Sequence, residues 1–234
     1  MIGVLSDAHG NALVFRRMLD ALFKLGAEKI IFLGDAVGYI PSVDVLATLM
    51  DMGARVQCIL GNHEQMLLDG HYPEHLESVY QIQATRSLLT PEQVDFISSW
   101  PKFREIEYPC GRALFVHGSP QDYQNGYVYP DTKLDVFDVP HDLVFMGHTH
   151  RAFVRQQGAR RFINVGSCGL PRDDGRYASS VLFDPKNGHV RLLRLDLSFF
   201  CADTYLARWV VHPSVTNLFL RRQDEVLGEF IESN

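Results

Sequence analysis

The chain has 234 residues, of which 46% are hydrophobic and 21% charged, as is usual for a soluble globular protein. Its formal net charge of -6 excludes a broadly basic surface, so long nucleic acid is not an expected partner. No apolar run approaches the roughly 20 residues of a membrane span, no signal peptide is visible, and four cysteines without a Cys-x-x-Cys pair favour a reduced, cytoplasmic protein over a disulfide framework.

Strand and helix alternate over the first sixty residues. Apolar runs that indicate buried strands lie at Ile2–Leu5, Lys29–Leu33 and Arg55–Leu60. Apolar residues at helical spacing separate these runs. One predicted helix is capped by Asn11 and ends at Gly26, and the next extends from Ser42 to Gly53. This alternation predicts a largely parallel sheet with right-handed crossovers.

The middle of the chain changes character. Residues 64–100 are polar and helical, with Thr90, Pro91 and Gln93 forming a capping box at a helix start. Strands are expected again at Ala113–Val116 and Leu143–Met146. Residues 119–140 between them are rich in Pro, Asp and Tyr and predict a long loop, and loops of that length are often functional.

The C-terminal third returns to strands. They are expected at Phe162–Val165, Ala178–Phe183 and Val190–Leu195, with Asn187-Gly188 as a hairpin turn. The tail after Leu195 carries no recognisable chemistry, and it could pack on the core or form the surface of a homo-oligomer. Without a linker or a repeat, we expect one domain over residues 1–234, with its motifs in 7–150 and the C-terminal strands and tail in 161–234.

Five short motifs follow predicted strands and supply seven candidate metal ligands. The ligands are Asp7, His9, Asp35, Asn62, His117, His148 and His150. In open α/β sheets the carboxyl ends of strands meet at one rim, so these side chains should converge there. Their oxygen and nitrogen donors suit divalent cations, and seven ligands are enough for two ions that share a carboxylate. Alternatively, the carboxylates and the amide could merely cap turns, and each histidine could be structural.

The ordered motifs Asp7-Ala8-His9, Gly34-Asp35, Gly61-Asn62-His63-Glu64, a lone His117 and Gly147-His148-Thr149-His150 resemble the calcineurin-like metallophosphoesterase superfamily. Asn164–Ser167 and Gly169–Arg172 are similar to its small bacterial and archaeal phosphodiesterase branch. The resemblance covers roughly the first 185 residues. It implies an α/β fold, a four-layer αββα sandwich with two mixed β-sheets flanked by helices.

The resemblance also implies the roles of the motif residues. One metal would take Asp7, His9, Asp35 and His150, and the other would take Asp35, Asn62, His117 and His148. His63 would face the substrate as the catalytic residue that stabilises or protonates the leaving oxygen. A metal-bridging hydroxide would attack phosphorus without a phosphoenzyme. The expected cofactors are two divalent transition-metal ions, with Mn or Fe favoured and Zn, Co or Ni allowed by the ligand set.

The sequence constrains the substrate less than it constrains the metal ligands. Phosphatases of the superfamily place an arginine after Gly-Asp, whereas this chain has Ala36-Val37-Gly38-Tyr39, which favours phosphodiesters over monoesters. Arg151 and Arg172 could compensate as substrate-binding residues, or could be solvated surface charges. Tyr123, Tyr127 and Tyr129 could stack on a nucleobase, or could cover the edge of the core.

The expected partner is therefore a small phosphorylated or nucleotide substrate. Three alternatives stay open: a phosphomonoesterase acting on proteins or small molecules, a nuclease, and a noncatalytic protein-binding scaffold of the same fold. The presence of His63 favours an enzyme over the scaffold.

Overall fold

The computed structural model describes residues 1–232 and contains two mixed β-sheets. The six-stranded sheet has the order β11-β10-β9-β1-β2-β3. Its strands are β1 (Ile2–Leu5), β2 (Lys29–Phe32), β3 (Val56–Cys58), β9 (Tyr177–Phe183), β10 (Val190–Asp196) and β11 (Glu229–Ile231). The predicted alternation is confirmed in β1, β2 and β3, which are parallel. On its other side β1 pairs with the antiparallel strand β9, which is followed by β10 and by the edge strand β11.

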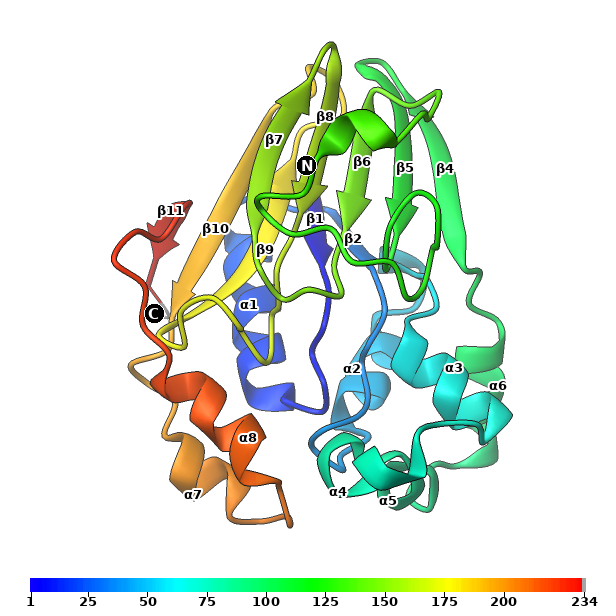
Figure 1. Ribbon diagram of the computed structural model, residues 1–234, viewed down its shortest axis with the longest axis vertical. Helices are drawn as coiled ribbons and strands as arrows, with labels where there is room; N and C mark the ends of the chain where they lie inside the picture. The colour runs from blue at the N-terminus through cyan, green and yellow to red at the C-terminus, as the bar shows by residue number, and fades with distance from the viewer. Residues whose placement is uncertain (233–234) are drawn as a thin grey trace.

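The five-stranded sheet has the order β4-β5-β6-β8-β7. Its strands are β4 (Phe103–Tyr108), β5 (Gly111–Val116), β6 (Leu143–Met146), β7 (Phe153–Gln157) and β8 (Arg160–Asn164). The central strands β5, β6 and β8 are parallel, and the two edges are antiparallel. In Figure 1 the arrowheads of β5 and β6 point toward the lower part of the molecule, where the helices gather.

Helices occupy the regions between and after the strands. The α-helices are α1 (Ala12–Lys24), α2 (Asp44–Met52), α3 (Asn62–Asp69), α4 (Glu77–Tyr80), α5 (Ile82–Arg86), α6 (Pro91–Ser98), α7 (Ala202–Leu206) and α8 (Pro213–Thr216). Short 3-10 helices are η1 (Gly53–Arg55), η2 (Glu74–Leu76), η3 (Leu134–Val136) and η4 (Asn217–Leu220). The predicted caps are present, because Asn11 accepts from the N–H of Val14 and the Thr90 capping box is formed. None of the helices in residues 1–232 is long and apolar enough to cross a membrane.

Three hydrophobic cores hold the layers together. Val4 and Ile31 of the first sheet meet Phe115 and Phe145 of the second in the core between the sheets. A larger core joins the other face of the six-stranded sheet to the helices. The outer face of the five-stranded sheet is covered by the long loop predicted at 119–140, which carries η3. The fold is therefore the predicted α/β sandwich of two mixed sheets flanked by helices.

Three strands were not predicted from the sequence. β4 and β7 are edge strands whose side chains are mostly exposed or half-buried, apart from the buried Phe153, so their runs are too polar to resemble buried strands. β11 has only three residues and pairs with the edge strand β10. The hairpin turn at Asn187-Gly188 is confirmed between β9 and β10, where Gly188 adopts a φ of +76°.

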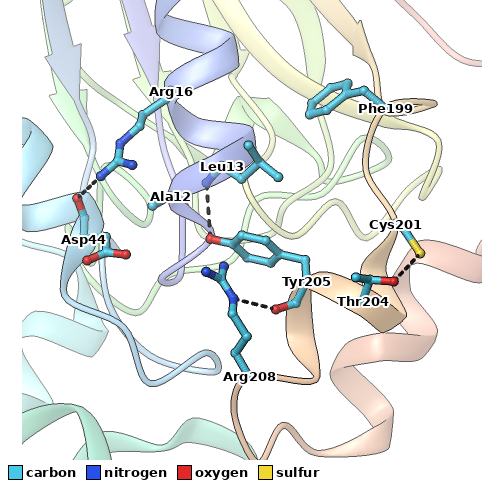
Figure 2. A pocket seen from close by; sticks show the side chains of 9 residues that line it. All are labelled: Ala12, Leu13, Arg16, Asp44, Phe199, Cys201, Thr204, Tyr205 and Arg208. Carbon is cyan, nitrogen blue, oxygen red and sulfur yellow. Dashed lines mark hydrogen bonds between the residues drawn. The ribbon is translucent and has the colours of Figure 1, made fainter.

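The tail after Leu195 packs on the helical side of the first sheet. Leu206, Val215 and Phe219 are buried in the larger core. Near the start of α1, the backbone N–H of Leu13 donates to the hydroxyl of Tyr205 at 3.3 Å, as Figure 2 shows. A cavity of about 540 Å³ lies between α1 and this part of the tail. None of the seven candidate ligands lines that cavity.

Candidate metal centre

The candidate ligands lie where strands end. Asp7 and Asp35 follow the parallel neighbours β1 and β2, and His117 directly follows β5. His148 comes after β6, and Asn62 begins α3 just after β3. Because the two sheets face each other, the carboxyl ends of strands from both sheets converge on one site.

The first group of ligands is Asp7, His9, Asp35 and His150, all of them buried. The Nε2 atom of His9 lies 3.0 Å from Nε2 of His150 and 3.5 Å from Oδ2 of Asp35. The Oδ1 atom of Asp7 lies 3.2 Å from Nε2 of His150 and 3.6 Å from Nε2 of His9. Four donor atoms from four separate motif positions therefore point at a common volume.

The second group is Asp35, Asn62, His117 and His148. The Nε2 atom of His117 lies 3.0 Å from Oδ1 of Asn62 and 3.2 Å from Nδ1 of His148. The same nitrogen lies 3.3 Å from Oδ2 of Asp35. One carboxylate oxygen, Oδ2 of Asp35, thus faces both groups of ligands.

Backbone carbonyls orient three of the histidines. The Nδ1 atom of His9 lies 3.0 Å from the carbonyl oxygen of Val37, that of His117 lies 2.8 Å from Leu33, and that of His150 lies 2.6 Å from Leu170. A carbonyl can only accept, so each Nδ1 carries the proton and each Nε2 can offer a lone pair to the centre.

The backbone at the site is held in an uncommon conformation. Within residues 1–232, seven non-glycine residues have φ between +48° and +64°, and six of them belong to the site or touch it. Those six are Asp7, His9, Asp35, Tyr39, His148 and His150. Each left-handed residue costs about 1–3 kcal/mol and persists only where its surroundings determine it, which is typical of functional sites.

The electrostatics of the cluster suit a cation. Burial opposes charge on Asp7 and Asp35, but the adjacent histidines outweigh it and hold the pKa of both carboxyls well below the usual range. Burial lowers the pKa of His148 to about 3 and that of His150 to about 4, so both are neutral. Burial also opposes a charge on His117, yet Asp35 prevails and raises its pKa to about 10.

The chemistry of these residues fits bound metal ions. Oδ1 of Asp7 is buried and accepts no hydrogen bond from any residue in 1–232, although it points at two histidines. A buried carboxylate oxygen left without a donor is costly unless a cation completes it. Cys168 is not among the groups of candidate donor atoms found within residues 1–232, and burial raises the pKa of its thiol.

Glu64 is a positioning residue to which the sequence assigned no role. Its buried carboxylate accepts hydrogen bonds from the backbone N–H groups of Asp35 (2.7 Å), Ala36 (2.7 Å), Val37 (3.2 Å) and Gly61 (3.0 Å). It ties the loop after β2 to the start of α3, and so fixes Asp35 relative to Asn62. Its position as the last residue of the Gly-Asn-His-Glu motif could have indicated this role.

His63 is buried next to both groups of ligands. Its backbone N–H donates to Oδ1 of Asp35 at 3.0 Å, and its ring lies 4.8 Å from the rings of His9 and Tyr39. Burial lowers its pKa to about 3. A side chain at Gly38 would clash with the imidazole, so this glycine makes room for His63.

Two of the candidate substrate-binding residues reach the site. The Tyr127 ring lies 4.2 Å from that of His148, and Nη2 of Arg172 donates to the Tyr39 hydroxyl at 2.6 Å. The ring of Tyr129 stacks on that of Tyr127, with ring centroids 5.8 Å apart, and so adjoins the site through Tyr127. Arg151 adjoins His150 in sequence and is half-buried.

Tyr123 is not brought to the cluster. Its ring packs 4.7 Å from that of Phe103 and against the outer core. Tyr39 and Tyr80, which received no role from the sequence, instead surround His63. A cavity of about 500 Å³ adjoins the second group of ligands and is lined by Asn62, His148, Tyr72, Tyr80 and Tyr127, among others.

Residues 1–188 match the family model described as the calcineurin-like phosphoesterase superfamily domain. An uncharacterized protein of Methanocaldococcus jannaschii is 28% identical over 214 residues, covering 84% of this chain and 87% of that protein. A hypothetical protein from Pyrococcus horikoshii OT3 has the same fold, with a TM-score of 0.81, 18% identity and coverage of 94% and 98%. A metallophosphoesterase from Sphaerobacter thermophilus gives a TM-score of 0.74 at 22% identity, with coverage of 94% and 97%.

Metal binding should release a proton. At pH 7 the metal-free protein holds a proton on His117, whose pKa is about 10, and a cation at the same nitrogen displaces it. Titration with Mn²⁺ by calorimetry in buffers of different ionisation enthalpy should show a release of about one proton, and affinity should rise with pH. The His117→Ala variant should lose this release. Buffer-independent heats for the unmodified protein would contradict the assignment.

The same proton affects the metal-free fold. The folded pKa of His117 lies above its ordinary 6.5, so its stabilisation is complete below pH 6.5 and is lost as pH rises through about 10. The melting temperature of the metal-free protein should therefore fall as the pH rises through about 10.

Proposed function

We propose that this protein, which belongs to the calcineurin-like phosphoesterase superfamily, is a two-metal phosphodiesterase acting on small phosphorylated or nucleotide substrates. The observation that carries the proposal is the position of Asp35. Its Oδ2 atom lies 3.5 Å from Nε2 of His9 and 3.3 Å from Nε2 of His117. A carboxylate shared by two complete ligand groups is the arrangement that a binuclear centre needs.

In this proposal one cation would be held by Asp7, His9, Asp35 and His150, and the other by Asp35, Asn62, His117 and His148. When bound, the two cations supply a water of lowered pKa as nucleophile and positive charge that neutralises the phosphoryl oxygens. The donors are nitrogen and oxygen without thiolate, which favours Mn or Fe and allows Zn, Co or Ni.

His63 acts on the leaving group. As the water oxygen adds to phosphorus, the bond to the leaving oxygen breaks, and the imidazole N–H of His63 donates a hydrogen bond or its proton to that oxygen. Burial keeps the imidazole neutral without substrate, and an adjacent anionic ester favours its protonated form. The rings of Tyr39 and Tyr80 hold it in place, at 4.8 Å and 5.0 Å.

Two features support a diester over a monoester. Tyr39 occupies the stretch where phosphatases of the superfamily carry an arginine, and its hydroxyl accepts from Arg172. The guanidinium of Arg172, already engaged by this hydroxyl, is a weaker clamp for a phosphate dianion than a free bidentate arginine. The cavity of about 500 Å³ beside Asn62 and His148 leaves room for a second ester group.

The walls of that cavity favour an aromatic group. Tyr72, Tyr80 and Tyr127 line it, and Tyr127 is half exposed with its ring 4.2 Å from that of His148. Aromatic rings stack on nucleobases without requiring a particular base. We therefore place the nucleoside or aryl part of the substrate in this cavity.

Turnover should depend on metal, on the diester and on His63. After removal of metal by a chelator and addition of Mn²⁺, bis-p-nitrophenyl phosphate should be hydrolysed faster than p-nitrophenyl phosphate. His63→Ala should lower kcat by about 10²–10⁴-fold for a diester with an alkyl leaving group. The loss should be smaller for p-nitrophenolate, which leaves readily without a proton.

His189→Ala removes an exposed histidine far along the chain and serves as the matched control. Equal losses for both leaving groups would remove His63 from the proton transfer. A preference for p-nitrophenyl phosphate would identify the protein as a monoesterase instead.

The aromatic cavity is tested separately. Tyr127→Ala should raise KM for nucleotide diesters by about tenfold, because one stacked ring contributes about 1–3 kcal/mol per base. The KM for dimethyl-type diesters without a ring should change little. Tyr123→Ala, which alters a ring packed on Phe103, should leave both values unchanged. Equal effects of Tyr127→Ala on all substrates would argue against base recognition.

A further inference from the structure

Three arginines come together on the His150 side of the metal centre. Arg151 directly follows His150, and the backbone N–H of Arg172 donates to the carbonyl of His150 at 3.2 Å. The guanidinium of Arg221, which belongs to the C-terminal tail, donates through Nη1 to the carbonyl of Arg172 at 3.0 Å. Arg172 and Arg221, which lie 49 residues apart in sequence, are thus brought together by the fold.

None of these arginines is neutralised by a carboxylate of residues 1–232. The two nearest acidic residues in sequence are already paired, Asp173 with Arg194 at 2.7 Å and Asp174 with Arg176 at 2.7 Å. Within residues 1–232, none of the three guanidinium groups forms an ion pair. Partial burial, together with the charges of Arg151 and Arg172, lowers the pKa of Arg221, as expected for like charges held close together.

The position of Arg221 is built into the fold. Its carbonyl accepts from the N–H of Gly175 at 2.9 Å, and the N–H of Gln223 donates to Oδ2 of Asp174 at 2.9 Å. Gly175 packs so closely that a Cβ there would clash with the carbonyl oxygens of Leu218 and Phe219. These contacts fix the segment after η4 against the loop that carries Arg172.

The arginines extend outward from the site itself. Arg172 hydrogen-bonds the hydroxyl of Tyr39, whose ring lies 4.6 Å from that of the ligand His9. Two bound cations would already neutralise the reacting phosphoryl group, so three further positive charges beside them exceed what one phosphodiester requires. Like charges held together without a counterion favour a bound anion.

We infer that Arg151, Arg172 and Arg221 form a subsite for a second phosphate of the substrate, next to the phosphodiester that is cleaved. This inference rests on the proposed function and narrows it. The substrate is then an organic ester with at least two phosphates, whose aromatic part lies in the tyrosine-lined cavity on the His148 side. It also gives the tail, which lies beyond the matched residues 1–188, a role in specificity.

A pair of substrates that differ only in one phosphate tests the subsite. They are thymidine 5′-(p-nitrophenyl phosphate) and the same compound with a 3′-phosphate, both of which release p-nitrophenol. The Mn²⁺-loaded protein should show a KM about tenfold lower for the 3′-phosphorylated compound, as one charge-assisted contact would give. Arg221→Gln should reduce this preference to about twofold while leaving kcat and KM for the other compound unchanged.

Arg222→Gln is the matched control. It removes the same charge from the next residue, whose guanidinium donates to the carbonyls of Phe219 and Arg221, and should preserve the preference. Equal KM values for the two substrates, or a preference that survives Arg221→Gln, would overturn the subsite.

Binding separates this inference from the proposed function. If neither compound is hydrolysed, the proposed function fails, and calorimetry with inorganic pyrophosphate on the metal-free protein still tests the subsite. Pyrophosphate should bind more weakly to Arg221→Gln than to the unmodified protein and to Arg222→Gln. Identical affinities in all three proteins would overturn the inference.

Discussion

The site depends on the carboxylate of Asp35. Its Oδ1 atom accepts from the backbone N–H of His63, and its own N–H donates to Glu64, so the group is held from both sides. Only Oδ2 is left to face the two groups of ligands, through His9 and His117. Because folding already immobilises this carboxylate, a cation that bound to it would not have to order it.

Holding the site residues in place costs free energy locally. Left-handed backbone at the ligand positions and the burial of two carboxylates are unfavourable in isolation, at about 1–3 kcal/mol for each strained residue. The cores on both faces of the six-stranded sheet and the carbonyls that orient the histidines offset these terms. The sandwich therefore stabilises a constellation that no single strand or loop could hold.

The sequence predicted features that depend on local pattern. Apolar runs located β1, β2, β5 and β6, and the polar residues after them identified candidate ligands that the fold brings together. It did not predict the edge strand β4, whose alternation is too polar. Nor did it predict Tyr39 beside His63, Glu64 across two loops, or Arg221 beside Arg172, because each depends on packing between distant segments. Tyr123 illustrates the converse, since composition alone cannot separate a loop aromatic facing the site from one packed on the core.

The most direct measurement is electron paramagnetic resonance of the protein loaded with Mn²⁺. Two ions that both bound the carboxylate of Asp35 would be close enough to be exchange-coupled, so we expect two ions per chain and the multiline spectrum of a coupled pair. Asp35→Asn should abolish the coupling. Binding of a single ion, or two ions with the spectrum of isolated Mn²⁺, would contradict a carboxylate of Asp35 that is shared between two ions.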